Sequence, residues 1–256
     1  MDIIIKILKK IKYLLLQKGN KTSQTYPYLF LEENNNVKFN INNPIEEFRL
    51  KHWGGEKEYI QKMLNDLTED DILYDIGSSV GLISILAAKK LAKGKVISFE
   101  PDPENASKLE ANYNINNLTN FSVQSLAVGE DTGMMELYTA GSNAFSPSLK
   151  KVNGIDTSIK VKIESVDNLI ERKEIPYPTV VKIDIEGAEM MALKGMEKLL
   201  NAKEKPRLLF IELHPDFLPS FRTSTEEIFS FLANLNYTIV ENIVREKQIL
   251  CKLVKN

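Results

Sequence analysis

The feature that most constrains the fold is a short apolar strand, expected at residues 72–76, that runs into a turn containing Gly77, Ser78 and Gly81. A helix is expected directly after the turn, at residues 82–93. Gly77 permits a positive φ or a close backbone approach. Gly81 allows the N-terminus of the helix to pack closely against the strand. The segment therefore predicts the first half of a βαβ unit with a ligand lying against its turn.

A second apolar run, residues 95–99, ends at Glu100 and Pro101. An acid at that place, roughly 20 residues after the turn, can accept two hydrogen bonds from a ribose diol. The dinucleotide fingerprint needs a middle glycine for the pyrophosphate, and this chain has Ser79 there. A ligand with an adenosine and no phosphates, such as S-adenosylmethionine, therefore fits better than a dinucleotide. Asp75 would repel phosphate and attract an ammonium group, directly or through water.

The remaining pattern predicts one α/β domain. Strands are expected at residues 121–128, 179–184 and 207–213, and helices at 56–67, 103–114, 189–200 and 225–235. Such alternation favours a Rossmann-like, mostly parallel sheet with helices on both faces and a ligand at the carboxyl ends of the strands. Strands at 237–240 and 248–254 are expected to form an antiparallel hairpin at the C-terminal end of the chain, which adds an antiparallel strand to the edge of this sheet. An excursion at about 134–163 predicts two paired strands, 134–139 and 159–163, and a loop between them that we expect to cover the acceptor pocket.

A second motif is more specific than the glycine turn. The run KIDIEGAE at residues 182–189, followed by LKG at 193–195, resembles the signature of the FkbM-type family of S-adenosylmethionine-dependent methyltransferases. Further segments resemble the family in its order: Asp75 to Gly77, Phe99 to Pro101, Leu109 with Asn112, residues 127–129, 165–169 and 211–215. The family commonly has Ala-Asn where this chain has Ser78 and Ser79, and Thr-Leu-Asp where it has Ser165, Val166 and Asp167.

The resemblance implies a class I methyltransferase fold with S-adenosyl-L-methionine as cofactor. It implies O-methylation of a hydroxyl on a sugar, a glycolipid or another small natural product. The alternatives are an NAD-type oxidoreductase and a non-catalytic module that binds S-adenosylmethionine. The cofactor-binding residues predicted on this interpretation are Asp75, Gly77, Ser78, Gly81, Glu100, Pro101, Ser125, Leu126 and Asp184.

The catalytic candidates are Asp184, Glu212 and His214, which are expected at the ends of neighbouring strands. Glu212 and His214 are two residues apart and share a side of their strand, so they can form a base with its orienting group. Glu189, at a helix start, is assigned mainly to the helix dipole. No tight ligand spacing indicates a metal, so none is expected; a divalent ion shared by Asp184, Glu212 and His214 stays an alternative.

Net charge and cysteine content argue against a nucleic-acid-binding protein, a disulfide-rich protein and a protein with a cysteine-based metal site. The formal net charge of −2 gives no basic excess for nucleic acid, which is therefore not expected as a partner. The single cysteine, Cys251, excludes a disulfide framework and a cysteine-based metal site. We expect a saccharide or small-molecule acceptor and an oligomeric state that the sequence leaves open.

The first 48 residues are expected to form an extension, and residues 49–256 the catalytic domain. Residues 1–18 have the pattern of a basic amphipathic helix, with apolar runs too short to cross a bilayer. This helix either docks on protein or lies on a membrane surface. Residues 33–43 are rich in asparagine and predict a loop or exposed hairpin. A cytoplasmic location follows, with peripheral membrane contact as the alternative.

Overall fold

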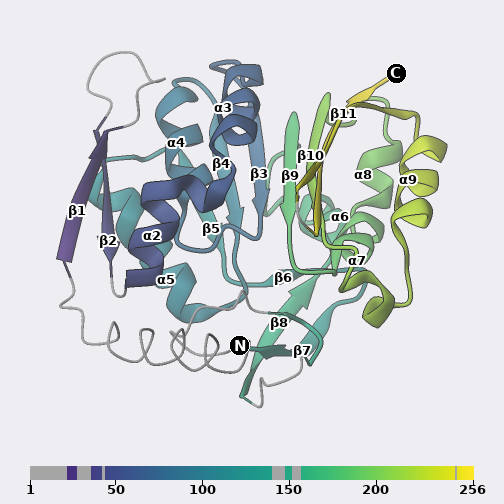
Figure 1. Ribbon diagram of the computed structural model, residues 1–256. Helices are drawn as coiled ribbons and strands as arrows, with labels where there is room; N and C mark the ends of the chain where they lie inside the picture. Colours follow the sequence, from purple (N-terminus) through teal and green to yellow (C-terminus); the bar gives the residue numbers. More distant parts are fainter. Residues whose placement is uncertain (1–21, 28–35, 42–43, 140–147, 152–156, 246) are drawn as a thin grey trace.

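The computed structural model of the chain describes residues 22–27, 36–41, 44–139, 148–151, 157–245 and 247–256, and its centre is a seven-stranded sheet (Figure 1). The strand order is β11-β12-β10-β9-β3-β4-β5. All neighbouring pairs from β10 to β5 are parallel, and β12 is antiparallel to both β10 and β11. This confirms the predicted sheet, whose strands are β3 (Ile72–Ile76), β4 (Lys95–Phe99), β5 (Phe121–Gln124), β9 (Val180–Asp184), β10 (Leu208–Leu213), β11 (Tyr237–Arg245) and β12 (Gln248–Lys255).

The strand order reverses between β3 and β9. After β3 the chain adds β4 and β5 on one side, and it later returns to the other side of β3 with β9 and β10. The carboxyl ends of β3 and β9 therefore adjoin at a topological switch point. Open α/β sheets bind their ligands at such points, so this edge is where a site is expected.

Helices cover both faces of the sheet (Figure 1). One face carries α3 (Lys57–Asp66), α4 (Leu82–Lys90) and α5 (Pro103–Ile115), and the other carries α6 (Val166–Glu171), α7 (Glu189–Lys194), α8 (Glu197–Asn201) and α9 (Thr225–Asn234). Successive β3 residues point to opposite faces of the sheet. Leu73 therefore packs in the hydrophobic core under α3, α4 and α5, and Tyr74 packs in the core under α6 to α9. The continuous apolar runs of the strands follow from this burial on both faces.

The excursion forms a second sheet of three strands in the order β6-β8-β7. Strands β7 (Gly133–Tyr138) and β8 (Ser158–Glu164) are antiparallel, which confirms the predicted pair. The single strand predicted at residues 121–128 is wrong. The backbone turns where Leu126 N donates to Gln124 O at 2.9 Å, and β6 (Ala127–Val128) then pairs with β8 in the smaller sheet.

The single helix predicted at residues 189–200 is also wrong, because α7 ends at Lys194 and α8 begins at Glu197. Asp167 stabilises the separate start of α8. Its carboxylate accepts hydrogen bonds from Lys198 N and Leu199 N, each at 2.9 Å, and its own N–H donates to Gly195 O at 3.1 Å. Asp167, which belongs to the family-like segment 165–169, thus has a structural role here.

The N-terminal part adds a hairpin of β1 (Thr22–Pro27) and β2 (Asn36–Ile41), followed by α2 (Pro44–His52) and the 3₁₀ turn η1 (Trp53–Gly55). Val37 and Phe39 of β2 are fully buried, so the expectation of an exposed hairpin is wrong for this strand. The boundary predicted after residue 48 falls inside α2, and the division into an extension and a catalytic domain stays a prediction. The helix predicted at residues 1–18 lies outside the described residues.

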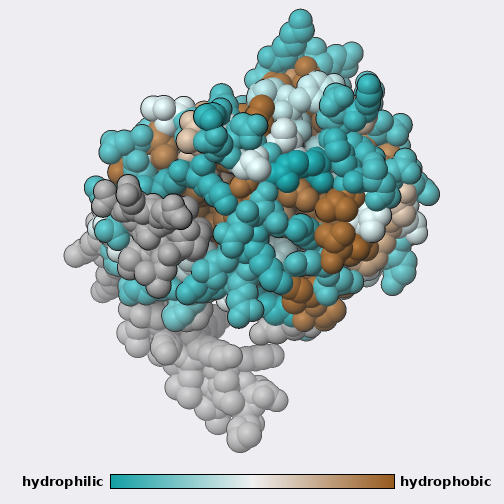
Figure 2. Space-filling view, turned by 90° about the horizontal axis from the view of Figure 1, so that it is seen from above, coloured by the Kyte–Doolittle hydropathy of each residue, from teal (hydrophilic) through white to brown (hydrophobic). Residues whose placement is uncertain are grey.

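Seen from above, the surface is mainly hydrophilic, and its hydrophobic residues lie in separate areas (Figure 2). No helix within the described ranges combines the length and the apolar character that crossing a membrane would need.

Candidate active site

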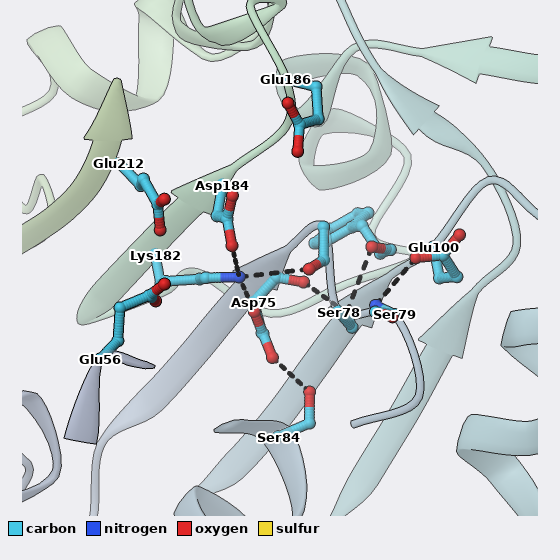
Figure 3. Close-up of polar contacts among 12 residues, drawn as sticks. Glu56, Asp75, Ser78, Ser79, Ser84, Glu100, Lys182, Asp184, Glu186 and Glu212 are labelled. Carbon is cyan, nitrogen blue, oxygen red and sulfur yellow. Dashed lines mark hydrogen bonds and ion pairs between the residues drawn. The ribbon is translucent and has the colours of Figure 1, made fainter. Parts of the chain in front are cut away.

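The turn after β3 is shaped by glycine at the switch point. Gly77 has φ +85°, and a Cβ there would lie 2.0 Å from Asp184 O. Only glycine therefore lets the ends of β3 and β9 approach this closely. Ser78 Oγ donates to Asp75 O at 2.7 Å, and this bond fixes the path of the turn (Figure 3).

The turn also orders Glu100 at the end of β4. Ser79 has a positive φ of 51° and donates its N–H to Glu100 Oε2 at 2.8 Å, while Asp102 N donates to Oε1 at 2.9 Å. Since Glu100 already accepts the N–H of Ser79, that group is not offered to a phosphate. The geometry thus agrees with the interpretation of Ser79 as a departure from dinucleotide binding.

A cavity opens over this carboxylate. Apolar side chains that include Phe99, Leu126 and Val128 line it beside Glu100 and Pro101. Glu100 is only 4% exposed, and burial raises its pKa to about 7, although the two backbone N–H groups oppose the shift. An apolar slot with one buried acid at its wall fits a nucleoside whose base packs against carbon and whose ribose donates hydrogen bonds.

Lys182 on β9 neutralises the acids beneath the turn. Its Nζ lies 3.0 Å from Asp75 Oδ1 and 3.7 Å from Asp184 Oδ2, and it donates to Gly77 O at 3.2 Å (Figure 3). Burial alone would lower the pKa of Lys182, but the charges of Asp75 and Asp184 hold it above its usual value. Asp75 is fully buried and also accepts from Ser84 Oγ, so the structure joins it to Lys182 as its cationic partner.

A second cavity adjoins the first and shares Gly77, Ser79 and Asp184 with it. Its wall is rich in charged and polar groups. Residues from several elements contribute, among them Arg49 of α2, Trp53 of η1, Glu56, Glu212 of β10 and Arg245 of β11. Glu56 Oε1 pairs with Arg245 Nη1 at 2.9 Å. The two cavities together can place an acceptor beside a bound cofactor.

His214 lies at the centre of an acidic cluster next to this second cavity. Its Nε2 is 3.6 Å from Glu212 Oε1 and 3.8 Å from both Asp184 Oδ1 and Glu186 Oε2. On the other side of the ring, Nδ1 is 2.7 Å from Glu189 Oε1. The structure thus brings together the three predicted catalytic residues.

Two details of the sequence interpretation need correction. Glu189, rather than Glu212, orients the imidazole, because Glu189 meets Nδ1 while Glu212 lies on the Nε2 side. Glu189 is also fully buried and accepts the N–H of Gly187 at 3.0 Å, so a surface role at the helix dipole does not describe it. No local signal marks this role, since Glu189 and His214 are 25 residues apart.

The cluster shifts the pKa values of its members. Burial would lower the pKa of His214, but the hydrogen bond with Glu189 and the charge of Asp184 outweigh it and raise the pKa to about 9. Burial and then the charges of Asp184 and Glu56 raise the pKa of Glu212. Burial and the charge of Asp184 likewise raise the pKa of Glu56. The crowded acids Glu212 and Glu56 therefore hold protons more tightly than free carboxyl groups do.

Most residues predicted to bind the cofactor line one of the two cavities. The first is lined by Gly77, Glu100, Pro101, Leu126 and Asp184, and the second by Asp75, Gly77, Ser78, Gly81 and Asp184. Ser125 is exposed and lines neither of these two cavities. Sequence reasoning missed the roles of Arg49, Trp53, Glu56, Lys182 and Glu189.

Comparison with known proteins gives concordant matches. The methyltransferase FkbM domain matches residues 74–239. The hexuronic acid methyltransferase AglP of Haloferax volcanii is 31% identical over 183 residues, which cover 70% of this chain and 70% of that protein. Methyltransferase 1 of Beauveria bassiana is 21% identical over 148 residues, covering 50% of this chain and 59% of that protein.

Among solved structures, methyltransferase FkbM from Methylobacillus flagellatus KT superposes with a TM-score of 0.51 at 19% identity. The match covers 73% of this chain and 44% of that one, so the present chain corresponds to less than half of that protein. At this identity the likeness concerns the fold.

Proposed function

Since the chain belongs to the FkbM family of methyltransferases, we propose that it methylates a hydroxyl or carboxylate oxygen of a saccharide. Its fold is the Rossmann-like class I methyltransferase fold, and its cofactor is S-adenosyl-L-methionine. The observation that carries the proposal is the pair of adjoining cavities, one apolar with a buried acid and the other polar with an aromatic wall. The name of the archaeal relative supports a sugar acceptor.

The residues of the first cavity fit the cofactor. Glu100 would accept hydrogen bonds from the ribose hydroxyls, and the apolar wall formed by Phe99, Leu126 and Val128 would hold the adenine. Gly77, Ser78, Gly81 and Asp184 border the space where the methionyl end would lie. When bound, S-adenosylmethionine supplies a methyl group on a positively charged sulfur.

The second cavity suits a saccharide. Trp53, the only tryptophan, lines it as a largely buried aromatic residue, and Arg49 and the paired Glu56 and Arg245 would meet sugar oxygens with polar groups. Arg49 borders both cavities and so stands where an acceptor would meet the cofactor. We assign to it the positioning of an anionic or hydroxylated acceptor.

Catalysis is assigned to Asp184, Glu212 and His214. In methyl transfer the acceptor oxygen forms the new bond to the methyl carbon, and the bond between that carbon and sulfur breaks with its electrons staying on sulfur. A hydroxyl acceptor also loses its proton, which Asp184 would receive, because Asp184 lines both cavities and the raised pKa values of His214 and Glu212 leave those groups protonated near neutral pH. Asp184 and Glu212 line the cavity, and Glu189 fixes the ring of His214 that contacts them. Correct placement of the oxygen contributes most of the remaining rate enhancement.

The proposed acceptor class is tested by methyl transfer from labelled S-adenosylmethionine to saccharides in matched pairs, a hexuronic acid and the neutral hexose of the same configuration. We expect labelled saccharide and S-adenosylhomocysteine in equal amounts. Arg49→Ala should raise KM for the uronic acid more than for the hexose, whereas Arg222→Ala, a change outside both cavities, should alter neither. Transfer to non-saccharide hydroxyls with none to any sugar would contradict the proposal.

Cofactor affinity is expected to depend on pH through Glu100. The pKa of this carboxyl is about 7 without cofactor, and only the ionised form accepts two ribose hydrogen bonds. Binding below pH 7 therefore requires loss of a proton, and affinity should fall by up to about tenfold per pH unit as pH decreases from 7, with a plateau above about pH 8. Calorimetric titration with S-adenosylhomocysteine from pH 5.5 to 8.5 measures this. Glu100→Gln is the control, and an identical slope in that variant would refute the assignment.

Peripheral membrane contact through residues 1–18 remains a prediction from the sequence pattern. It would bring the enzyme to a lipid-linked acceptor. Sedimentation with anionic liposomes, comparing the full chain with one that lacks the first 18 residues, decides the matter, because equal binding rejects the contact.

A further inference from the structure

Asp184 and Glu212, which line the acceptor cavity, lie with the buried His214 in a group of three side chains that can ligate a divalent cation. One donor atom from each of Asp184, Glu212 and His214 lies within 4.8 Å of the others. Asp184 and Glu212 are directly opposite in the parallel pairing of β9 and β10. A cation about 2.1 Å from each of its ligands holds those ligands roughly 3–4.2 Å apart. The separations of 3.6 and 3.8 Å from His214 Nε2 to the two carboxylates fall in that range.

The imidazole is held as metal-binding imidazoles usually are. A histidine that ligates a metal almost always donates its other ring N–H to a carboxylate or carbonyl, which fixes the tautomer and the ring orientation. Here Nδ1 faces Glu189 Oε1 at 2.7 Å, and Glu189 is completely buried. A metal would bind the neutral imidazole, with Nδ1–H donated to Glu189 and with the ion in place of the proton at Nε2, which faces Asp184 and Glu212; Nε2 also lies 3.4 Å from Gln248 Nε2.

Glu212 adds a further observation. It is 5% exposed, and among the ion pairs of the described residues its carboxylate meets one cation, His214, whose Nε2 lies 3.6 Å from Glu212 Oε1. Its neighbours Asp184 and Glu56 have Lys182 and Arg245 as cationic partners. Figure 3 shows Glu56, Asp184 and Glu212 pointing toward the same space. Buried carboxylates are stable when they are paired or coordinate a metal.

We propose that Asp184, Glu212 and His214 hold a divalent cation beside the acceptor, where it would coordinate the acceptor oxygen; this inference rests on the proposed function. Two carboxylates with one imidazole suit Mn²⁺ or Mg²⁺ better than soft metal ions. The sequence indicated no metal because the ligands come from two neighbouring strands, 28 to 30 residues apart, and not from one local spacing.

Binding of Mn²⁺ to the purified full chain without cofactor, followed by electron paramagnetic resonance, tests the proposal. We expect saturable binding of one ion. Glu212→Gln and Asp184→Asn should each weaken it by about tenfold or more. Asp216→Asn is the matched control, because Asp216 is close in sequence, exposed and paired with Lys247. Circular dichroism and melting curves confirm that each variant is folded.

The same protein is titrated with S-adenosylhomocysteine in the presence of EDTA, which separates the two hypotheses. Cofactor binding without saturable Mn²⁺ binding would overturn the cation site and leave the proposed function standing. Mn²⁺ affinity equal to wild type in both folded variants would also overturn it. Absence of cofactor binding by the wild-type chain would instead contradict the proposed function. Restoration of saccharide methylation by Mn²⁺ after EDTA treatment would support the cation site.

Discussion

His214→Ala is expected to lower the turnover of saccharide methylation by about a hundredfold or more, while cofactor affinity changes by less than about twofold. The variant removes the imidazole that contacts Asp184, Glu186 and Glu212 through one nitrogen and Glu189 through the other. The loss appears mainly in turnover because His214 does not line the cofactor cavity, although Asp184 and Glu186 border both cavities. Single-turnover methylation and calorimetric titration with S-adenosylhomocysteine measure the two effects separately.

Because His214→Ala leaves the buried carboxylate of Glu189 without the imidazole, a second variant is needed that keeps a hydrogen-bond donor for Glu189. His214→Gln can keep an amide donor for that carboxylate, so it separates loss of the reactive nitrogen from loss of stability. The protein has one other histidine, the exposed His52, and His52→Ala should leave turnover unchanged. Wild-type turnover in folded His214→Ala and His214→Gln would assign the residue to structure alone.

Glu100→Ala is expected to weaken cofactor binding by about 1.5–3 kcal/mol, the range for a lost charged hydrogen-bond partner. That range corresponds to roughly a tenfold to more than a hundredfold rise in Kd. The carboxylate is buried in the wall of the apolar cavity and is held by Ser79 N and Asp102 N. Titration of the folded variant with S-adenosylhomocysteine gives the change directly.

The control for Glu100→Ala is Glu110→Ala, on the exposed side of α5. It removes a carboxylate of the same kind away from both cavities, so cofactor affinity should stay at the wild-type value. Equal affinity in Glu100→Ala and wild type, with both proteins folded, would remove Glu100 from the ribose site.

Most of the residues predicted to bind the cofactor line one of the two cavities, because the sequence signals for them are local. The apolar run of β3, the glycines of the following turn and the acid after β4 are read within about 30 residues. A backbone conformation such as the positive φ of Gly77 favours glycine, so the residue type indicates the conformation.

The acceptor half was less predictable because tertiary packing assembles it. Glu56 and Arg245 meet across 189 positions of the sequence, and Glu189 reaches His214 from the start of another helix. The split of residues 121–128 between two sheets has a similar origin, since Ala127 and Val128 keep a strand conformation but pair with β8 and do not extend β5. No periodicity within one segment reports such contacts.

Isothermal titration of the wild-type chain with S-adenosylmethionine, S-adenosylhomocysteine and NADH tests the central claim most directly. The proposed site predicts saturable binding of both sulfur compounds and none of NADH, since Glu100 occupies the N–H of Ser79 and Asp75 lies beneath the turn. Binding of NADH without either sulfur compound would contradict the account and favour a nucleotide-dependent oxidoreductase.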